Sequence, residues 1–510
     1  MSSLAFVHRA QARAEHTAIN APEGRFSYGD LLDASARAAA VLLDGRDDLR
    51  EARVAFLAPA GWDYVVTLWA IWRAGGVAVP LAVSHPAPEL RQIVADADPE
   101  IIVAHQDFAG VLQPIAAAKP ARFIGTQDLT GRTTHHAPPT PSLPAVPETQ
   151  RALIIYTSGT TGTPKGVVTT HANIRAQVSS LHEAWGWSGD DRILLVLPLH
   201  HVHGIVNVLL GALWAGATCE ILPRFDAERV WDRLASGELS VFMAVPTIYH
   251  KLISAFDAAA TERQGAWSRG AKALRLMVSG SAALPVRTLE RWREIAGHTL
   301  LERYGMTEIG MGLSNPYAGK RRAGFVGTPL PGVTARVVDE HGVAVKPGSA
   351  GELEIRGPTV FLEYWRRPDA TAAAFRDGWF RTGDVAIVEE GSYRLLGRAS
   401  VDIIKTGGFK VSALEIEEVL RTHPAIAECA VVGVADEEWG ERVCVALELR
   451  SGSLGLEDLQ RWAKELLAPY KVPRDLRVVG ALPRNAMGKV TKPDVARLFG
   501  AQNVPRPSRF

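Results

Sequence analysis

Apolar residues in the first third of the chain alternate between short continuous runs and stretches with helical spacing. Ser27 and Asp30 have the spacing of a capping box and predict a helix that runs through residue 43. Further apolar residues at helical spacing predict helices at 62–74 and 90–95. Continuous apolar runs predict strands at 54–57, 77–81 and 101–104. This order of strand, helix and strand is typical of a parallel sheet covered by helices.

The same alternation of strands and helices begins again after a connector at 130–148 that is rich in threonine, proline and histidine. Apolar runs predict strands at 193–197, 218–222, 241–245 and 274–278. Helices are expected after His203 and from Ala227, which makes a second α/β layer similar in style to the first. Prolines and glycines then interrupt short β-like runs at 327–355, which predicts a small β unit.

The pattern changes again after Gly397 and Arg398. Strands are expected at 431–434 and 443–449, and helices at 413–422 and 456–467. We therefore predict an α/β protein in three parts. A large N-terminal domain of two stacked α/β layers and the small β unit takes 1–397, a hinge takes 398–402, and a mobile, smaller α+β C-terminal lid takes 403–510.

Composition excludes several classes of function. The 510 residues are enough for two to four folding units, and the formal net charge of +1 gives no reason to expect a nucleic-acid or anionic-membrane partner. The three cysteines, Cys219, Cys429 and Cys444, lie far apart and are expected to be structural in a reducing cytoplasm. No apolar run approaches the roughly 20 residues that span a bilayer, and the first residues lack the apolar core of a secretory signal. A cytoplasmic location is expected.

The strongest chemical signal follows an apolar strand at 152–155. It is the run YTSGTTGTPKG from Tyr156 to Gly166, in which glycines let backbone N–H groups close around an anion and hydroxyls add donors. It is not a Walker A loop, because Pro164 stands where the second glycine should be. A flexible linker would not need two Thr-Gly steps after a buried strand, so we predict a phosphate-binding loop. Its predicted contacts are Thr157, Ser158, Gly159, Thr160, Thr161, Gly162 and Lys165.

This loop resembles the phosphate loop of the adenylate-forming superfamily, which comprises acyl-CoA synthetases, peptide-synthetase adenylation domains and luciferases. Other motifs of that family follow in order, and they are LPLHHVHG at 197–204, YGMTE at 304–308, RTGD at 381–384, Gly397-Arg398, and PRNAMGK at 483–489. Together they cover the chain from about residue 20 to residue 495. The resemblance implies an enzyme that uses ATP, Mg²⁺ and coenzyme A to convert a carboxylic acid into its CoA thioester through an acyl-adenylate.

The resemblance also implies roles for single residues. Thr307 is expected to hydrogen-bond the α-phosphate and Glu308 to hold Mg²⁺, because a carboxylate that attacks a phosphate brings anion onto anion. Asp384 is expected to accept the ribose hydroxyls, with Arg398 beside it. The adenine slot is expected to be lined by Gly280, Ser281 and Ala282, and Tyr304 is a further expected cofactor-binding residue. Alone, each residue would be interpreted as a cap, a turn or a surface ion pair, and the ordered motifs favour the functional interpretation.

Lys489 is expected to reach the α-phosphate and the attacking carboxylate during adenylation. In the resembled family the small domain then rotates, and Gly407 and Gly408 are expected to meet the pantetheine arm of CoA. The hinge stretch is one residue longer than in many relatives. Lys489, exposed in the open state, is also an expected target of a lysine acetyltransferase and deacetylase.

The acid itself is predicted from three stretches, at 201–203, 274–284 and 301–310, which resemble malonyl-CoA synthetases that use malonate and methylmalonate. A second substrate carboxylate is costly to bury unpaired, and an arginine offers it a matching planar fork. The predicted substrate residues are His201, His203, Arg275 and Ser279. The alternative for Arg275 is a structural ion pair at a strand start.

Three other functions stay open at this point. One is a synthetase for short- or medium-chain monocarboxylic acids with an apolar acyl pocket. The second is an adenylation enzyme that loads a carrier-protein thiol. The third is a catalytically dead nucleotide-binding relative, against which the presence of both Lys489 and Glu308 argues.

Overall fold

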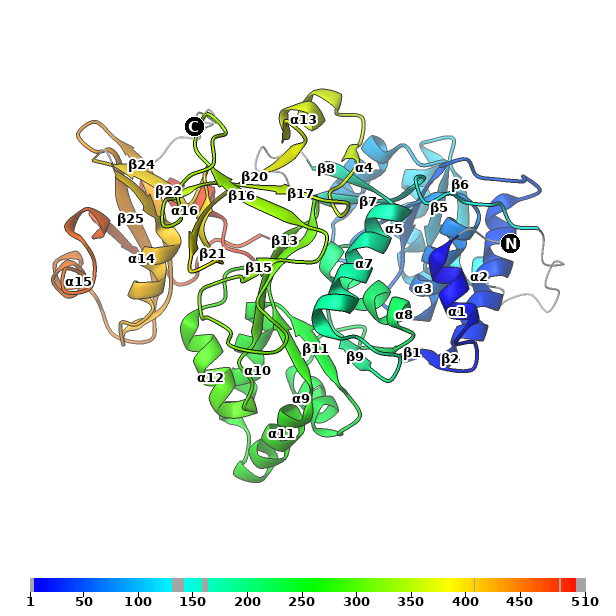
Figure 1. Cartoon of the computed structure of the whole chain (residues 1–510), viewed down its shortest axis with the longest axis horizontal. Coiled ribbons are helices and arrows are strands. Elements are labelled where there is room, and N and C mark those ends of the chain that lie inside the picture. The colour runs from blue at the N-terminus through cyan, green and yellow to red at the C-terminus, as the bar shows by residue number, and fades with distance from the viewer. Residues whose placement is uncertain (1–3, 131–141, 158–163, 408, 486–487, 501–510) are drawn as a thin grey trace. The chain divides into compact units, whose positions relative to one another are not determined.

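The computed structural model describes residues 4–130, 142–157, 164–407, 409–485 and 488–500 (Figure 1). The chain forms two compact units, one from Met1–Thr334 with Arg356–Phe375 and one from Ala335–Ile355 with Arg376–Phe510. Residues 335–355 of the predicted small β unit thus share a compact unit with the C-terminal residues, whereas residues 327–334 belong to the first unit. The hinge at 398–402 concerns movement and stays a prediction.

The first unit contains a nine-stranded sheet whose centre is parallel, as the second predicted α/β layer requires. Antiparallel strands extend it at both edges. In spatial order the strands are β15 (Thr328–Pro329), β14 (Gly310–Ser314), β13 (Leu301–Met306), β12 (Leu276–Ser279), β11 (Val241–Ala244), β9 (Arg192–Leu195), β10 (Thr218–Ile221), β1 (Thr17–Ala21) and β2 (Gly24–Ser27).

A seven-stranded sheet in the same unit matches the first predicted layer, and its strands from β7 through β6 are parallel. In spatial order the strands are β18 (Glu363–Tyr364), β8 (Lys165–Thr170), β7 (Arg151–Thr157), β4 (Val77–Pro80), β3 (Arg53–Leu57), β5 (Ile101–Ala104) and β6 (Arg122–Gly125). β18 joins this sheet by pairing antiparallel to β8, although some 200 residues separate the two strands in sequence. This pairing was not predicted.

The helices of the first unit are α1 (Ala5–Gln11), α2 (Tyr28–Leu43), α3 (Trp62–Arg73), α4 (Ala87–Ala97), α5 (Gln106–Ala117), α6 (Thr126–Thr130), α7 (His171–Trp185), α8 (Gly211–Ala215), α9 (Ala227–Ala235), α10 (Pro246–Ala258), α11 (Thr261–Ala273), α12 (Val286–Ala296) and α13 (Pro368–Ala373). The capping box of α2 is confirmed, because the Ser27 hydroxyl accepts the Asp30 N–H and the Asp30 carboxylate accepts the Ser27 N–H. A second capping box, Thr170 with Asn173, starts α7, which was not among the predicted elements.

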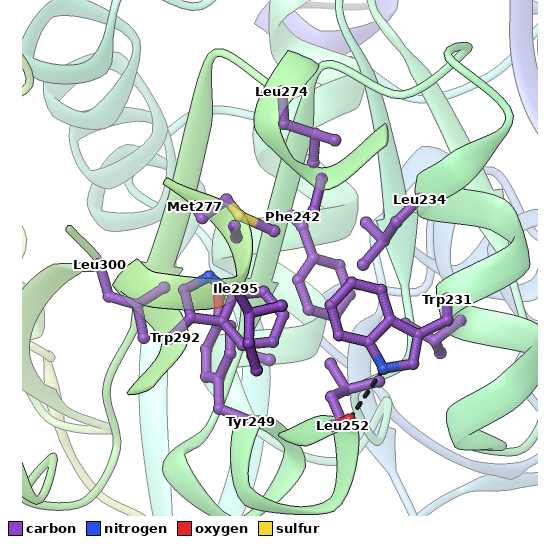
Figure 2. Packing of buried hydrophobic residues seen from close by; sticks show 14 of the residues in the cluster. Trp231, Leu234, Phe242, Tyr249, Leu252, Leu274, Met277, Trp292, Ile295 and Leu300 are labelled. Atoms are coloured by element: carbon purple, nitrogen blue, oxygen red, sulfur yellow. Dashed lines mark hydrogen bonds between the residues drawn. The ribbon is translucent and has the colours of Figure 1, made fainter. Parts of the chain in front are cut away.

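An aromatic core packs α9, α10, α11 and α12 against β11 and β12 (Figure 2). The indole of Trp231 stacks on Trp292, with ring centroids 5.3 Å apart, and its Nε1 donates to the carbonyl of Leu252 at 2.8 Å. The hydroxyl of Tyr249 donates to the carbonyl of Val278 at 2.9 Å. The core therefore holds β12 one residue before Ser279.

The segment after the predicted histidine motif forms a π-helix, η1 (His203–Leu210), which is buried along its whole length. A helix was predicted here, but its type was not. A π-helix has one more residue per hydrogen-bonded turn than an α-helix and is frequently found at functional sites. Its first residue, His203, is one of the predicted substrate residues.

The second unit is built around two five-stranded sheets. The first holds β16 (Thr334–Val338), β17 (Gly351–Arg356), β20 (Trp379–Glu389), β19 (Phe375–Arg376) and β21 (Ser392–Arg398). The other holds β23 (Phe409–Ser412), β22 (Ile403–Thr406), β25 (Gly440–Leu449), β24 (Ile426–Asp436) and β26 (Asp475–Val478). The helices of this unit are α14 (Ala413–Leu420), α15 (Leu456–Ala463), a short 3-10 helix η2 (Pro469–Lys471) and α16 (Lys492–Arg497). The predicted mixed α/β class, with a larger N-terminal and a smaller C-terminal part, is confirmed.

All three cysteines are buried and free, and burial raises the pKa of Cys219 and Cys429, which keeps both as thiols. Within the described ranges, no helix has the length and hydrophobicity that a bilayer crossing requires.

Candidate active site

A polar cluster of buried His203, buried Arg303 and exposed Ser281 forms where β12 and β13 meet the start of η1. Ser281 follows β12 with a backbone φ of +69°, which is uncommon for a residue with a side chain. Its hydroxyl oxygen lies 3.3 Å from Nδ1 of His203 and 3.3 Å from Nη2 of Arg303. A Cβ on Gly280 would stand 2.5 Å from Nε of Arg303, so glycine lets the backbone approach the guanidinium. Three elements thus converge on one hydroxyl.

Electrostatics make this cluster cationic but keep the imidazole neutral. Burial, helped by the positive charge of Arg303, holds the pKa of His203 well below its ordinary value. Burial lowers the pKa of Arg303 to about 9, which still leaves the guanidinium charged at pH 7. Both side chains are only 4% exposed. A buried positive charge of this kind is expensive unless an anion accompanies it.

Several buried polar atoms around the cluster have no hydrogen-bond partner among the residues that the structure describes. They are Arg303 Nε, His203 Nε2, Ser279 Oγ and Asn207 Oδ1. Buried polar groups in folded proteins are nearly always hydrogen-bonded, so a concentration of unpartnered ones marks a place for a ligand. Asn207 Oδ1 is an acceptor, but the Arg303 Nε donor and its fixed positive charge favour a ligand that is an anion and an acceptor.

The structure does not bring Arg275 into this cluster. Arg275 precedes β12, at the opposite end of the strand from Ser279. Its Nε and Nη2 donate to the two carboxylate oxygens of Asp191 at 2.7 and 2.6 Å, and its Nη1 donates to the carbonyl of Trp185 at 2.8 Å. We therefore correct the prediction for Arg275, whose guanidinium belongs to a structural ion pair at the strand start.

Arg303 was missed as a candidate although it lies in one of the quoted stretches. Arg275 precedes β12 and Arg303 lies within β13, and the sequence did not show which of the two guanidinium groups a structural carboxylate pairs with. The predicted His201 is half-buried, and its ring contacts that of His200 with centroids 4.1 Å apart. The structure thus brings His203 and Ser281 together directly, with Ser279 two residues away on the same strand end.

The turn between β13 and β14 holds Thr307 and Glu308 in the first unit. Glu308 is 7% exposed, and its backbone carbonyl accepts the N–H of Phe361 at 2.7 Å. The hydroxyl of Tyr364 donates to Glu308 Oε1 at 2.9 Å. Thr307 is half-buried, and Tyr304 is buried within β13. Across the described residues, no group of three or more histidine, cysteine, aspartate or glutamate side chains could hold a metal ion by itself.

The predicted phosphate loop spans the gap between β7 and β8. The two strands form an antiparallel ladder that closes at the pair Thr157 and Lys165. Ser158, Gly159, Thr160, Thr161 and Gly162 lie outside the described residues. Lys165, at the start of β8, places its Nζ 5.0 Å from the ring centroid of Tyr364. The sheet therefore fixes both ends of the loop.

In the second unit, the predicted ribose residues are brought together. Asp384 on β20 pairs with Arg398 on β21 across the ladder, and Arg398 Nε lies 3.0 Å from Asp384 Oδ1. The predicted hinge residue Asp402 accepts the N–H of Arg398 at 3.0 Å through Oδ2. Its Oδ1 lies 3.4 Å from Nζ of Lys492, which also contacts the buried carboxylate of Glu417.

Lys489 is exposed in the second unit. Its N–H donates to the side chain of Asn485 at 3.0 Å, and its carbonyl accepts the N–H of Asn485 at 2.9 Å. Gly407 has a backbone φ of +55° and donates its N–H to the carbonyl of Trp439 at 2.9 Å. Gly408 lies outside the described residues.

Comparisons with known proteins agree with this layout. Residues 6–365 match the AMP-binding enzyme family, and residues 415–489 match the AMP-binding enzyme C-terminal domain. The mitochondrial malonate–CoA ligase ACSF3 of Homo sapiens is 47% identical over 530 residues, which cover 96% of this chain and 91% of that protein.

Solved structures agree as well. ATP-bound MatB from Rhodopseudomonas palustris superimposes with a TM-score of 0.88 at 33% identity, covering 98% of this chain and 99% of that one. A malonyl-CoA ligase in a ternary product complex with methylmalonyl-CoA and AMP gives a TM-score of 0.69 at 35% identity, covering 94% of this chain and 100% of that one. The family predicted from the ordered motifs is confirmed, and the chain belongs to the AMP-binding enzymes.

Proposed function

We propose that this protein is an AMP-forming ligase that joins malonate, and also methylmalonate, to coenzyme A. In the first half-reaction a substrate carboxylate oxygen bonds to the α-phosphorus of ATP and pyrophosphate leaves. In the second, the sulfur of CoA bonds to the acyl carbon and AMP leaves. The names of the similar proteins support malonate as the acid, since the human relative is a malonate–CoA ligase.

The observation that supports a dicarboxylate most directly is the guanidinium of Arg303. It is buried, charged and without a partner at Nε within the described part of the chain. A carboxylate at the far end of the substrate would offset this buried charge, whereas a methyl group would leave it unpaired. Neutral His203 and the Ser281 hydroxyl would complete the site for that carboxylate.

Adenylation requires that negative charge be neutralised around the α-phosphate. We assign this to the phosphate loop with Lys165, to the hydroxyl of Thr307 and to the ammonium of Lys489. Glu308 offers a buried carboxylate oxygen, which fits Mg²⁺ because that ion usually takes one or two carboxylates and completes its shell with substrate phosphates and water. When bound there, Mg²⁺ would screen phosphate charge.

The nucleoside and the thiol complete the proposal. The ion pair of Asp384 and Arg398 would hold the ribose, and the backbone at 280–282 would line the adenine. Gly407 and Gly408 would admit the pantetheine arm after a rotation at 398–402. The thiolate of CoA is itself the nucleophile, so no dedicated general base is required.

Two finer points remain predictions of the same proposal. A cytoplasmic location is expected from the sequence, while the human relative carries the word mitochondrial in its name. Regulation by acetylation at Lys489 is expected because the side chain is exposed and its charge is needed for adenylation.

A coupled assay tests the function. Pyrophosphate release and CoA-thioester formation are measured with malonate, methylmalonate, acetate and butyrate, each with CoA and with a phosphopantetheinylated carrier protein as the thiol. We expect the highest kcat/KM with malonate and CoA, good activity with methylmalonate and weak activity with both monocarboxylates. A preference for butyrate would establish the monocarboxylate synthetase instead, and transfer only to the carrier would establish the loading enzyme.

A further inference from the structure

Tyr364 lies outside every motif that identified the family, yet it touches two of them. It is the last residue of β18, and the β18–β8 ladder pairs it with Val167. The N–H of Trp365 donates to the carbonyl of Gly166 at 2.7 Å, which extends the pairing toward the phosphate loop. Backbone hydrogen bonds therefore fix Tyr364 beside the point where the loop re-enters the sheet.

The side chain of Tyr364 bridges the loop end and the acidic turn. Its hydroxyl donates to Oε1 of Glu308 at 2.9 Å, and the face of its ring lies 5.0 Å from Nζ of Lys165. The residue is 9% exposed, so both contacts are made in a largely water-excluded place. A second backbone bond, from Phe361 to the carbonyl of Glu308, ties the same segment to the same turn.

Each contact restricts a group that the proposed chemistry needs. A hydrogen bond to one oxygen fixes the rotation of a carboxylate, and outer partners of this kind are usual for carboxylates that ligate metals. A cation–π contact restrains a lysine ammonium without neutralising its charge. A phenylalanine would keep the ring and lose the hydroxyl, so the two contacts can be separated by substitution.

We propose that Tyr364 is a positioning residue that orients Glu308 toward a divalent cation through its hydroxyl and holds Lys165 toward phosphate through its ring. The proposal rests on the function proposed above. It adds that residues 361–364, which lie outside the motifs quoted above, set the geometry between the metal carboxylate and the end of the phosphate loop at Lys165.

The test measures cation binding directly, without turnover. Mn²⁺ is titrated into the full-length protein with α,β-methylene ATP, which cannot release pyrophosphate, and free Mn²⁺ is followed by electron paramagnetic resonance. Wild type, Glu308→Gln, Tyr364→Phe and the control Tyr28→Phe are compared. Tyr28 is a matched control because its buried hydroxyl donates to the carbonyl of Ala217 at 2.7 Å, in the other sheet of this unit.

We expect Tyr364→Phe to weaken Mn²⁺ binding about ten-fold, Glu308→Gln to weaken it at least as much, and Tyr28→Phe to match the wild type. Tyr364→Leu, which also removes the ring, should weaken metal-free binding of the analogue about two- to five-fold, whereas Tyr364→Phe should not. Unfolding temperatures verify that each variant is folded.

The outcomes separate the two proposals. If Glu308→Gln loses Mn²⁺ while Tyr364→Phe binds it like the wild type, the positioning role is overturned and the metal role of Glu308 stands. If Glu308→Gln also binds Mn²⁺ like the wild type, both roles are overturned. The ligase function is then still decided by malonate-dependent pyrophosphate release in the wild type.

Discussion

Arg303 Nη2 and Ser281 Oγ lie 3.3 Å apart, although Arg303 lies in β13 and Ser281 follows β12. Parallel pairing of β12 with β13, in which Ser279 is opposite Glu302, places the carboxyl end of β12 beside the first residues of β13. The contact therefore follows from sheet register. In doubly wound α/β proteins this edge of the sheet is where ligands bind.

Substitution of Arg303 tests the substrate carboxylate. We expect Arg303→Met to reduce kcat/KM for malonate at least about 100-fold, because one partner of a buried charge pair is removed. Activity with butyrate should fall far less or rise, since methionine is apolar. The measurement is kcat/KM for both acids in both proteins. Equal losses with malonate and butyrate would contradict a role in recognising the second carboxylate.

Arg275 should behave in the opposite way. Arg275→Met leaves Asp191 buried without its main partner, and we expect the free energy of unfolding at pH 7 to fall by about 3 kcal/mol. The kcat/KM for malonate per folded molecule should stay within a few-fold of the wild type. A variant that is fully stable but inactive with malonate would restore Arg275 to the acid site.

The same pair predicts a pH dependence of stability. Burial alone would raise the pKa of Asp191, but hydrogen bonds from Arg275, Ser240 and the Ser188 backbone lower it. In the wild type, ionised Asp191 contributes to the free energy of unfolding above its unfolded pKa of about 3.9. This stabilisation is lost only as the pH falls through the lower pKa that Asp191 has in the folded protein. In Arg275→Met burial dominates and raises the pKa. In urea unfolding, the difference in the free energy of unfolding between the wild type and Arg275→Met should therefore become smaller from pH 7 toward pH 4.5.

His171 predicts a further acid sensitivity. Burial lowers the pKa of His171 to about 3, whereas the unfolded chain titrates near 6.5. Below pH 6.5 the unfolded chain binds a proton at His171 that the folded protein does not bind. The free energy of unfolding therefore falls by up to about 2 kcal/mol between pH 7 and pH 5. His171→Gln should flatten the pH profile of unfolding by that amount. His341→Gln, at a side chain 79% exposed, is the control and should leave the profile unchanged.

Lys489→Ala should separate the two half-reactions. Malonate-dependent pyrophosphate release should fall by two to three orders of magnitude, because the lysine charge is needed when the α-phosphate is attacked. Conversion of supplied malonyl-AMP and CoA to malonyl-CoA should persist. Equal loss of both steps would contradict an adenylation-specific role.

Acetylation of Lys489 should act like the alanine substitution because it removes the same charge. The protein is acetylated enzymatically, the extent at Lys489 is measured by mass spectrometry, and adenylation is assayed. A lysine deacetylase should restore activity. Full adenylation at complete modification would rule out this form of regulation.

The sequence predicted most elements because their determinants are local. Helical spacing and a capping pair were enough for α2, and apolar runs were enough for the central parallel strands of both large sheets, although not for β1, β6 or β13. What it could not predict depends on pairing across long distances. The sequence does not distinguish Arg275 from Arg303 as a substrate residue. The ion pair of Arg275 with Asp191, which lies 84 residues earlier in the chain, appears only in the folded structure. Tyr364 gains its position only from the ladder of β18 with β8.

The π-helix η1 has a consequence for how acid specificity can change. Residues 203–210 contain more residues per turn than an α-helix needs, so a one-residue deletion would allow the segment to become α-helical. Each residue of an α-helix rotates the chain by about 100° around the helix axis. The deletion would therefore turn the His203 side chain away from Ser281, although the residue would still be a histidine. With the substrate role proposed for His203, the length of the chain at this position would set acid specificity, and insertions or deletions would act as substitutions do elsewhere.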